Sequence, residues 1–462
     1  MNRALTSVSP TKDSLDNDKN EKNDNKKHKV MKKSIKNGML LMATCTLTMG
    51  FVSCSSHDDQ NELIFVTNEQ NVAIEALTKQ YLSDVVYPTY GNLANECERL
   101  YSKISTLKAK LKAGTAVSQD EIDDICTTYK NARKYWEQSE AFLYGAASDF
   151  EIDPHIDTWP LDVPTLGEDL TDNAKIARLD AADGIEYART SLTAENLGFH
   201  GLEFIFFRDG RNRSAAFFNN DEQETDSHIT AKGDVTGREE VIFATAVAGD
   251  LRDKCFQLEV AWNPDASAAH KSRVAECAKT SDDFETKVSK NGLTYGENLV
   301  AVNSGNSTYN SWKKVMEEIL VGGCSNICAE VADQKMGQAY RAATGTGEAD
   351  DDPNYIESPY SHNSFTDFYD NIISIQNVLY NNVEGTAATS SSVMSYLQKY
   401  NAAEAVALQT KLTAALESLR ACQNSGKSFV EAPGATWVKD AMDAVSSLDD
   451  ELNEVANWIL KN

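Results

Sequence analysis

Proline is scarce in this sequence, with nine residues in 462. Because proline interrupts an α-helix, its scarcity favours long helices. No segment alternates polar and apolar residues over enough positions to predict a β-sheet, whereas several segments repeat apolar residues at helical spacing. The helix lengths predict an all-α protein of two antiparallel four-helix-bundle-like halves with long ordered loops.

Basic residues are also in short supply, since 44 Lys+Arg stand against 70 Asp+Glu and give a formal net charge of −26. A surface this acidic repels nucleic acid and anionic lipid, so neither is an expected partner. It attracts cations, although an ordinary solvated face is the simpler interpretation of most of the charge.

The cysteines are too irregular for a disulfide framework. Seven remain beyond Cys45 and Cys54, an odd number at wide spacing. Cys324 and Cys328 lie one helical turn apart, but no second pair completes a zinc site. Small buried side chains are the favoured interpretation, and a disulfide or metal role for that pair is the alternative.

The N-terminal segment has the parts of an export signal. Residues 1–30 are a polar leader, and from Met31 three lysines precede an apolar run over 38–52 that is too short for a comfortable transmembrane helix. The ending Phe-Val-Ser-Cys54 resembles the lipobox of bacterial lipoproteins, in which the cysteine is lipidated and becomes the first mature residue. An ordinary cleaved signal peptide is the alternative.

A lipidated Cys54 would tether the protein to a membrane without a spanning helix. The next residues, SSHDDQNE, resemble the acidic signals that send some lipoproteins to the outer face of the outer membrane. We therefore expect a lipid anchor in the outer membrane of a Gram-negative bacterium, on the periplasmic or the cell-surface face. The expected parts of the chain are a leader and signal (1–53), a flexible tether (54–70), an N-terminal helical bundle (71–224) and a C-terminal helical bundle (225–462).

Helical periodicity places the individual helices. Residues 71–112 predict a long amphipathic helix bent near Pro88, and a capping box of Ser118 and Glu121 starts a second helix that ends near Tyr144. Three of the nine prolines fall in 149–167, which predicts an extended ordered loop. The other expected segments are helices over 172–189, 235–262, 267–287, 308–342, 364–382, 393–422 and 435–460, and an irregular connection over 344–363.

The segment NLGFHGLEFIFF, residues 196–207, places two polar side chains in an apolar run. Three residues apart on a helix, His200 and Glu203 can approach one point, where an imidazole and a carboxylate can share a divalent or ferric ion or act as an acid/base pair. Gly198 and Gly201 would permit close approach of another backbone or of a ligand. A buried hydrogen bond between His200 and Glu203 is the alternative.

Further polar residues gather in the segment 133–162. Glu137 and Glu140 lie three apart near a helix end, and the proline-rich loop carries His155, Asp157, Trp159 and Asp162. These side chains are available to face the same cleft as His200 and Glu203.

Five segments of the sequence resemble one known protein family. GFHGLE (198–203) matches the GxHxxE motif of the imelysin-like family, and four other segments are similar to that family: WEQSEAFLYG (136–145), IDPHIDTWPLD (152–162), AEVADQK (329–335) and ESPYSHNSFTDFYDNI (357–372). The resemblance implies an all-helical protein of two four-helix-bundle-like halves, exported in Gram-negative bacteria and linked to iron uptake. The family is named after an insulin-cleaving protease and is grouped as a metallopeptidase. The positions carried over are His200 and Glu203, with Glu137, Glu140, Asp157 and Trp159 as motif neighbours.

A peptidase would have to assemble its site from distant segments. The chain has no HExxH, no HxxEH because Phe204 follows Glu203, and no G-x-S-x-G elbow. The ligands would come from His200 and Glu203 together with Glu140, Asp157, His155 or His362. For His362, a loop or capping hydrogen bond is the simpler role.

Metal binding requires fewer specific groups than a peptidase and is the favoured interpretation. One histidine and several carboxylates suit iron, with zinc as an alternative, and haem is disfavoured because no CxxCH motif occurs. The expected partners are the membrane, through Cys54, and the iron-uptake machinery, whereas the oligomeric state is not predicted. The expected metal ligands are His200, Glu203, Glu140 and Asp157, and the expected ligand-binding neighbours are Glu137, Trp159, His155 and His362.

A third interpretation needs no metal at all. Trp136, Tyr144, Trp159 and Phe199 could line a groove for a peptide or a glycan, or belong to a scaffold module. Aromatic residues at helical spacing more often belong to the core.

Overall fold

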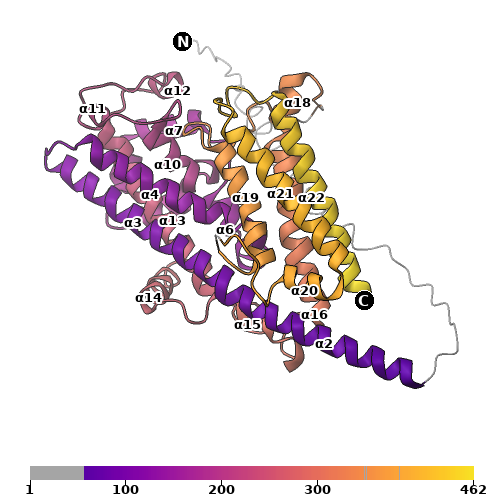
Figure 1. Ribbon diagram of the computed structural model, residues 1–462. Helices are drawn as coiled ribbons and strands as arrows, with labels where there is room; N and C mark the ends of the chain where they lie inside the picture. The colour runs from indigo at the N-terminus through magenta and orange to yellow at the C-terminus, as the bar shows by residue number, and fades with distance from the viewer. Residues whose placement is uncertain (1–56, 348, 350, 384) are drawn as a thin grey trace, which may run out of the picture. The chain divides into compact units, whose positions relative to one another are not determined.

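The computed structural model describes residues 57–347, 349, 351–383 and 385–462 (Figure 1). The chain divides into two units, residues 1–63 and 64–462, and apart from the helical residues 57–63 the features below belong to the second. The predicted leader, the signal and Cys54 lie outside the described residues. No helix within the described ranges is both long enough and apolar enough to cross a membrane.

Helices make up nearly all of the regular structure in the described ranges, which confirms the predicted all-α class. A short hairpin of β1 (Phe207–Arg208) and β2 (Arg211–Asn212) was not expected from the sequence. Its turn residues Asp209 and Gly210 have φ values of 49° and 74°. Two left-handed residues are what a two-residue hairpin turn requires.

The helix predicted over 71–112 ends at the expected Lys112 but begins earlier, at His57, within the predicted tether. Close to Pro88, where a bend was predicted, a π-helical turn, η1 (Leu82–Val86), separates α2 (His57–Tyr81) from α3 (Tyr87–Lys112). The predicted capping box of Ser118 and Glu121 begins α4 (Gln119–Glu137).

The end of α4 comes well before the predicted Tyr144. Ser139 Oγ donates to Trp136 O at 2.7 Å, and Ala141 N donates to Ser374 Oγ at 3.0 Å. These serine side chains form hydrogen bonds with backbone groups that would bond to other backbone groups if the helix continued. A short 3₁₀ turn, η2 (Glu140–Phe142), follows instead.

The proline-rich segment 149–167 is helical in large part, so the prediction of an extended loop was wrong there. It contains α6 (Ile152–Ile156) and the start of α7 (Val163–Thr171), after α5 (Ala146–Asp149). Pro154 and Pro164 lie in the first turns of α6 and α7, where a missing backbone N–H costs no hydrogen bond.

The helix predicted over 172–189 is broken into two pieces. These are α8 (Asn173–Leu179) and α9 (Gly184–Ser191). A Cβ on Gly184 would lie 2.1 Å from Leu179 O, so the chain closes tightly on itself between them. The segments up to residue 230 are η3 (Ala194–Asn196), α10 (Gly198–Phe206), α11 (Ala215–Phe218) and α12 (Ser227–Thr230).

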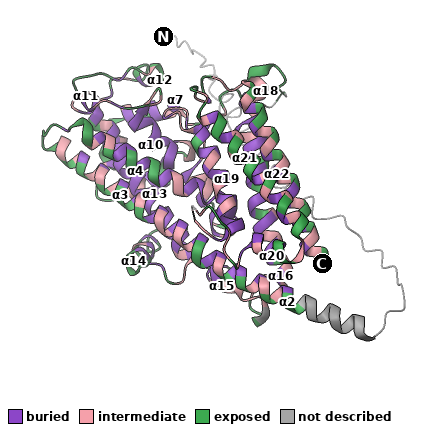
Figure 2. Ribbon diagram, in the orientation of Figure 1, coloured by how far each residue is buried: buried purple, intermediate pink, exposed green. Residues whose placement is uncertain are grey.

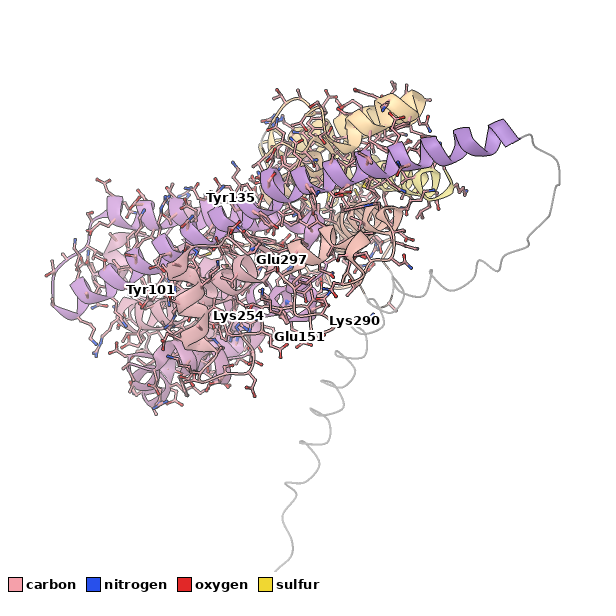
Figure 3. The ribbon with its side chains drawn as sticks, turned by 90° about the horizontal axis from the view of Figure 1, so that it is seen from below. Tyr101, Tyr135, Glu151, Lys254, Lys290 and Glu297 are labelled. Atoms are coloured by element: carbon pink, nitrogen blue, oxygen red, sulfur yellow. The ribbon has the colours of Figure 1, made fainter. Side chains whose placement is uncertain are left out.

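The helix α13 (Gly237–Trp262) is buried over almost its whole length and is the central element of the described fold (Figure 2). It packs against α3, α9, α10 and α14. At the α3 contact, the guanidinium of Arg252 lies 4.2 Å from the ring centre of Tyr101, which is labelled in the view from below (Figure 3). The helix predicted over 235–262 is confirmed almost to the residue.

The helix predicted over 308–342 begins at Trp312 and is irregular. Two π-helical stretches, η5 (Glu318–Ser325) and η6 (Glu330–Lys335), alternate with α16 (Trp312–Glu317), α17 (Asn326–Ala329) and α18 (Gly337–Thr344). A Cβ on Gly323 would lie 2.0 Å from Ala141 O, so η5 and η2 touch backbone to backbone. The remaining elements are α14 (Ala268–Cys277), α15 (Tyr295–Val300), η4 (Val302–Ser304), α19 (Ser364–Tyr380), α20 (Val393–Tyr400), α21 (Ala402–Gln423) and α22 (Thr436–Lys461).

The main hydrophobic cluster draws on both predicted halves of the chain, from Ile74 to Ile459. Within it, α19 packs against α4 and η2 on one side and against α21 on the other. The predicted boundary at residue 225 stays a prediction. What matters for function is that α4, α6, α10, η6 and α19 lie next to one another.

Candidate functional site

The segment that carries His200 and Glu203 is a fully buried helix. All nine residues of α10 are buried (Figure 2), which fits an apolar helix packed against α13. Gly198 begins it with φ 62°, and a Cβ there would lie 1.9 Å from Ile156 O; a Cβ on Gly201 would lie 2.3 Å from Asn196 O. Both glycines therefore serve the close backbone approach that the sequence predicted.

Asp157 is the first partner of His200. Its Oδ1 lies 3.0 Å from His200 Nε2 and also pairs with Arg133, while its Oδ2 accepts a 2.7 Å hydrogen bond from Trp136 Nε1. Burial alone would raise the pKa of Asp157, but Arg133 and His200 outweigh it and hold that pKa well below its usual range. Burial disfavours the imidazolium, yet the neighbouring carboxylates of Asp157 and Glu203 raise the pKa of His200 to about 9.

Glu203 is held from one side by a loop that lies far away in the sequence. Its Oε1 accepts hydrogen bonds from Tyr360 N at 3.1 Å, Ser361 N at 2.8 Å and Ser361 Oγ at 2.7 Å. Its Oε2 lies 3.5 Å from His200 Nδ1. Neither of these two facing atoms has a hydrogen-bond partner in the described structure, although both are buried.

Two permanent cations, Arg133 and Lys335, lie beside this pair. Arg133 pairs with Glu137 at 2.5 Å and with Glu357 at 2.6 Å, in addition to Asp157. The Lys335 ammonium lies 3.1 Å from Glu357 Oε1. Arg133 therefore ties α4 to α6 and to the loop before α19.

Carboxylates outnumber these two cations. Lys335 lies 3.5 Å from Glu140, and Arg133 Nε lies 3.7 Å from Asp367. Burial raises the pKa values of Glu137 and Glu140 well above their usual range, although Arg133 and Lys335 act against the shift. The buried carboxylates of the cluster are Glu137, Glu140, Asp157, Glu203, Glu357 and Asp367.

Within this cluster, two groups of side chains have the spacing of a metal ligand set. Ligand atoms of Asp157, His200 and Glu357 lie within 4.8 Å of one another. The same holds for Glu137, Glu140 and Asp157. Four of the acidic and imidazole residues expected from the sequence therefore meet at one place, together with Glu203.

Three expected neighbours have other surroundings. His155 Nε2 lies 2.6 Å from Asp250 Oδ2, on the side of α6 that faces α13. Trp159 stacks on Tyr355, with ring centres 3.9 Å apart. His362 is half-buried and lines a surface pocket with Phe365, Lys427 and Glu431.

The other side chains of the proline-rich loop and the aromatic set have structural roles. Asp162 caps α7, because its side chain accepts from Thr165 N at 3.1 Å. Trp136 and Phe199 pack together with ring centres 6.4 Å apart, and Tyr144 packs on Trp262. The aromatic residues considered for a peptide or glycan groove thus belong largely to the core.

Sequence reasoning missed Arg133, Lys335, Glu357, Ser361 and Asp367. One signal was available: Arg133 lies one helical turn before Glu137, the spacing of an ion pair on one helix face. The other four lie in or beside the quoted segments AEVADQK and ESPYSHNSFTDFYDNI, but no local pattern marks them as buried.

The charge of Asp367 gives a prediction for pH dependence. Burial, aided by Glu357 and opposed by Arg133, raises the pKa of Asp367 to about 7. Because the folded pKa lies above the unfolded one, the stability contributed by the bound proton is complete at low pH and is lost as pH rises through about 7. When the pH is raised from ~5 to ~8, the free energy of unfolding of the wild type should therefore fall by about 2 kcal/mol more than that of Asp367→Asn, which has no carboxyl group to ionise.

Urea unfolding of both proteins in chelator, at the two pH values, measures this difference. The Ser358 hydroxyl donates to Asp367 at 2.5 Å. It can rotate to accept from the asparagine amide of the variant, so Ser358 keeps a hydrogen-bond partner. Parallel pH profiles for the two proteins would contradict the prediction.

Comparison with known proteins identifies one family and relatives with similar names. The family model described as Imelysin matches residues 86–454. A curated relative, iron-regulated protein A of Synechococcus elongatus, is 22% identical over 373 residues, which cover 80% of this chain and 83% of the relative.

Two solved structures are similar in fold. A Parabacteroides distasonis protein, provisionally named an iron-regulated protein A precursor, is 21% identical, with a TM-score of 0.58 and coverage of 84% of this chain and 95% of that one. An imelysin-like protein from Psychrobacter arcticum is 14% identical, with a TM-score of 0.46 and coverage of 84% and 93%. The first of these likenesses supports the all-helical fold.

Proposed function

Because the chain belongs to the imelysin family, as the GxHxxE resemblance predicted, we propose that it binds a metal ion between His200 and Glu203 in the service of iron uptake. Iron is the proposed ion and zinc the alternative. The protein would be exported and held at the outer membrane by a lipidated Cys54, next to the machinery that takes up iron.

One observation carries the proposal. His200 Nδ1 and Glu203 Oε2 lie 3.5 Å apart, both are buried, and neither has a hydrogen-bond partner in the described structure. A buried polar atom without a partner costs free energy, so two such atoms facing each other call for a third group between them. A cation is the group that an imidazole nitrogen and a carboxylate oxygen can share.

The surroundings of this pair suit a metal. Asp157 accepts from His200 Nε2, so Nδ1 is the nitrogen that would give up its proton when a cation binds; a histidine ligand is commonly fixed by a carboxylate in this way. Tyr360 N, Ser361 N and Ser361 Oγ hold Glu203 Oε1, so that Oε2 is the atom left to bind. Asp157 and the loop at 360–361 then orient the two ligands.

The charge of the cluster points in the same direction. Its six buried carboxylates outnumber its two permanent cations, and a bound cation would favour the ionised forms that burial disfavours in Glu137 and Glu140. Glu140 can become a ligand only if the Lys335 ammonium, 3.5 Å away, gives way. The choice of iron rests on the nitrogen and oxygen donors of the site and on the name of the Synechococcus relative, iron-regulated protein A.

Calorimetric titration of the chelator-stripped mature protein with ferrous, ferric and zinc ions tests the proposal. His200→Ala and Glu203→Gln should each weaken binding at least about tenfold, the smallest effect usual for groups that only support a metal ligand. His228→Ala, which removes an exposed histidine, should leave the affinity unchanged. Unaltered affinity in both site variants, or no binding to the wild type, would refute the site.

Burial weighs against the peptidase that the family name suggests. The side chains of His200 and Glu203 are 1% and 0% exposed, so a polypeptide could reach them only after a conformational change. Incubation with unfolded insulin chain, with and without a chelator, distinguishes the two functions. Chelator-sensitive cleavage that His200→Ala abolishes would replace the binding proposal by the enzymatic one.

A further inference from the structure

A second group of carboxylates lies away from His200, where α21 packs against α22 (Figure 1). Glu404 lies in the first turn of α21, while Glu451 and Glu454 lie three residues apart on α22. One oxygen from each carboxylate lies within 4.8 Å of the others. Oxygens bound to one calcium ion at about 2.3–2.6 Å can be no further apart than about this distance.

The burial of Glu451 distinguishes this group from ordinary acidic surface. Glu451 is only 8% exposed, and its Oε1 has no hydrogen-bond partner in the described structure. The same carboxylate is directed at those of Glu404 and Glu454. Placing like charges together around a buried oxygen that water does not reach is unfavourable unless a proton or a metal cation is shared among them, and a shared proton is what Glu404 and Glu451 have without a metal.

The protein's own cations do not supply that charge. Within the described ranges, no lysine or arginine nitrogen forms an ion pair with Glu404, Glu451 or Glu454. Lys411 on α21 is in the neighbourhood, but its ammonium donates to Ser447 Oγ at 2.7 Å. The three carboxylates therefore form an all-oxygen site with a net negative charge.

We propose that Glu404, Glu451 and Glu454 bind a divalent cation, calcium in preference to magnesium, that fastens the start of α21 to α22. Carboxylate oxygens without nitrogen or sulfur ligands suit hard cations. Calcium tolerates the irregular geometry of three glutamates and completes its shell with water, whereas magnesium requires a shorter, near-octahedral arrangement. Glu454, which is exposed, leaves the ion open to solvent on one side.

The test must separate this site from general screening, because a protein with a net charge of −26 is stabilised to some extent by any added cation. Thermal unfolding of the chelator-stripped mature protein is followed in calcium chloride, in magnesium chloride and in sodium chloride of equal ionic strength. Calorimetry with calcium gives stoichiometry and affinity. The variants are Glu451→Gln and Glu404→Gln, with Glu417→Gln as control, since Glu417 is exposed on α21 and loses the same charge.

We expect the wild type and Glu417→Gln to bind one calcium ion and to melt at a higher temperature in calcium than in matched sodium. Glu451→Gln should fold at least as well without calcium, because it removes a buried charge, and should bind calcium at least about tenfold more weakly. Glu404→Gln, at a half-buried position, should lose affinity without affecting folding. No calcium-specific shift in the wild type, or an equal loss in Glu417→Gln, would overturn the proposal.

The outcome is independent of the His200 site. The titrations are repeated in a His200→Ala background, which removes a proposed ligand of the iron site. Calcium binding that survives there and disappears on adding Glu451→Gln belongs to the α21–α22 carboxylates. Calcium binding that disappears with His200→Ala alone would assign the ion to the other cluster and overturn this inference.

Discussion

Replacing Arg133 by methionine should lower the free energy of unfolding by about 3–5 kcal/mol, the usual cost of breaking a buried ion pair from one side. The Arg133 side chain is 1% exposed and pairs with carboxylates from three segments: Asp157, Glu137 and Glu357. Methionine fills most of the volume, so the loss comes from the charges left without a partner. Urea unfolding at neutral pH in chelator measures it.

The control is Arg99→Met on α3. Arg99 also pairs with a glutamate, Glu96, at 2.5 Å, but its side chain is 65% exposed. Exposed ion pairs contribute at most about 1 kcal/mol, so this variant should be close to the wild type. Equal, small losses for Arg133→Met and Arg99→Met would mean that the buried carboxylates are protonated and need no guanidinium.

The same variant links stability to the proposed function. Removing Arg133 increases the excess of negative charge around His200 and Glu203, so a bound cation should stabilise Arg133→Met more than the wild type. The ferrous-ion-dependent rise in melting temperature should therefore be larger in the variant. A smaller rise would indicate that Arg133 holds the ligands in place rather than competing for them.

The sequence was sufficient to predict the local features of this fold. Periodicity located α13, α19 and α22 to within a few residues, because each has an apolar pattern long enough to show the helical repeat. The capping box at Ser118 was predicted for a similar reason, since both of its hydrogen bonds join residues three positions apart.

The contact between His200 and Glu203 is also a local feature that the sequence could predict. Their spacing on a helix was enough to bring the imidazole and the carboxylate to 3.5 Å. Local sequence decides such contacts, and they need no knowledge of the rest of the fold.

The cations of the site could not be predicted, because their burial depends on contacts across the whole chain. Arg133 and Glu357 are separated by 224 positions, and Ser361 reaches Glu203 across 158. Glu137 lies one helical turn after Arg133, but solvated ion pairs have the same spacing, so this spacing does not mark the arginine as buried. Its position is decided only when α4 packs beside α19 and the loop that precedes it.

The two residues His155 and Asp157 illustrate a second limit. They are neighbours in the sequence, yet His155 turns to Asp250 on α13 while Asp157 turns to His200 on α10. The helix α6 has only five residues, too few to establish a periodic apolar face. Which side of so short a helix faces the site is decided by its neighbours.

Replacing Gly198 by alanine should destabilise the protein by more than about 4 kcal/mol, a loss seen only when a substitution breaks a specific structural requirement. Gly198 has φ 62°, and a Cβ there would lie 1.9 Å from Ile156 O and 2.5 Å from Ile156 Cα. Both obstacles are backbone atoms, which no rotation of a side chain can remove. Urea unfolding of the variant measures the loss.

Gly114→Ala separates the two contributions to this loss. Gly114 has a similar φ of 69°, but a Cβ added there meets no atom within 4 Å. It therefore reports the left-handed conformation alone, which costs an alanine about 1–2 kcal/mol. The difference between the two variants is the cost of pushing Ile156 away.

That displacement should also reach the proposed metal site, because Asp157 follows Ile156 directly. If Gly198→Ala moves the backbone at Ile156, the 3.0 Å contact between Asp157 Oδ1 and His200 Nε2 opens and the imidazole loses its orientation. Any folded Gly198→Ala protein should therefore bind the ion at least about tenfold more weakly, while Gly114→Ala binds it normally. Full affinity in folded Gly198→Ala would mean that Asp157 does not orient His200.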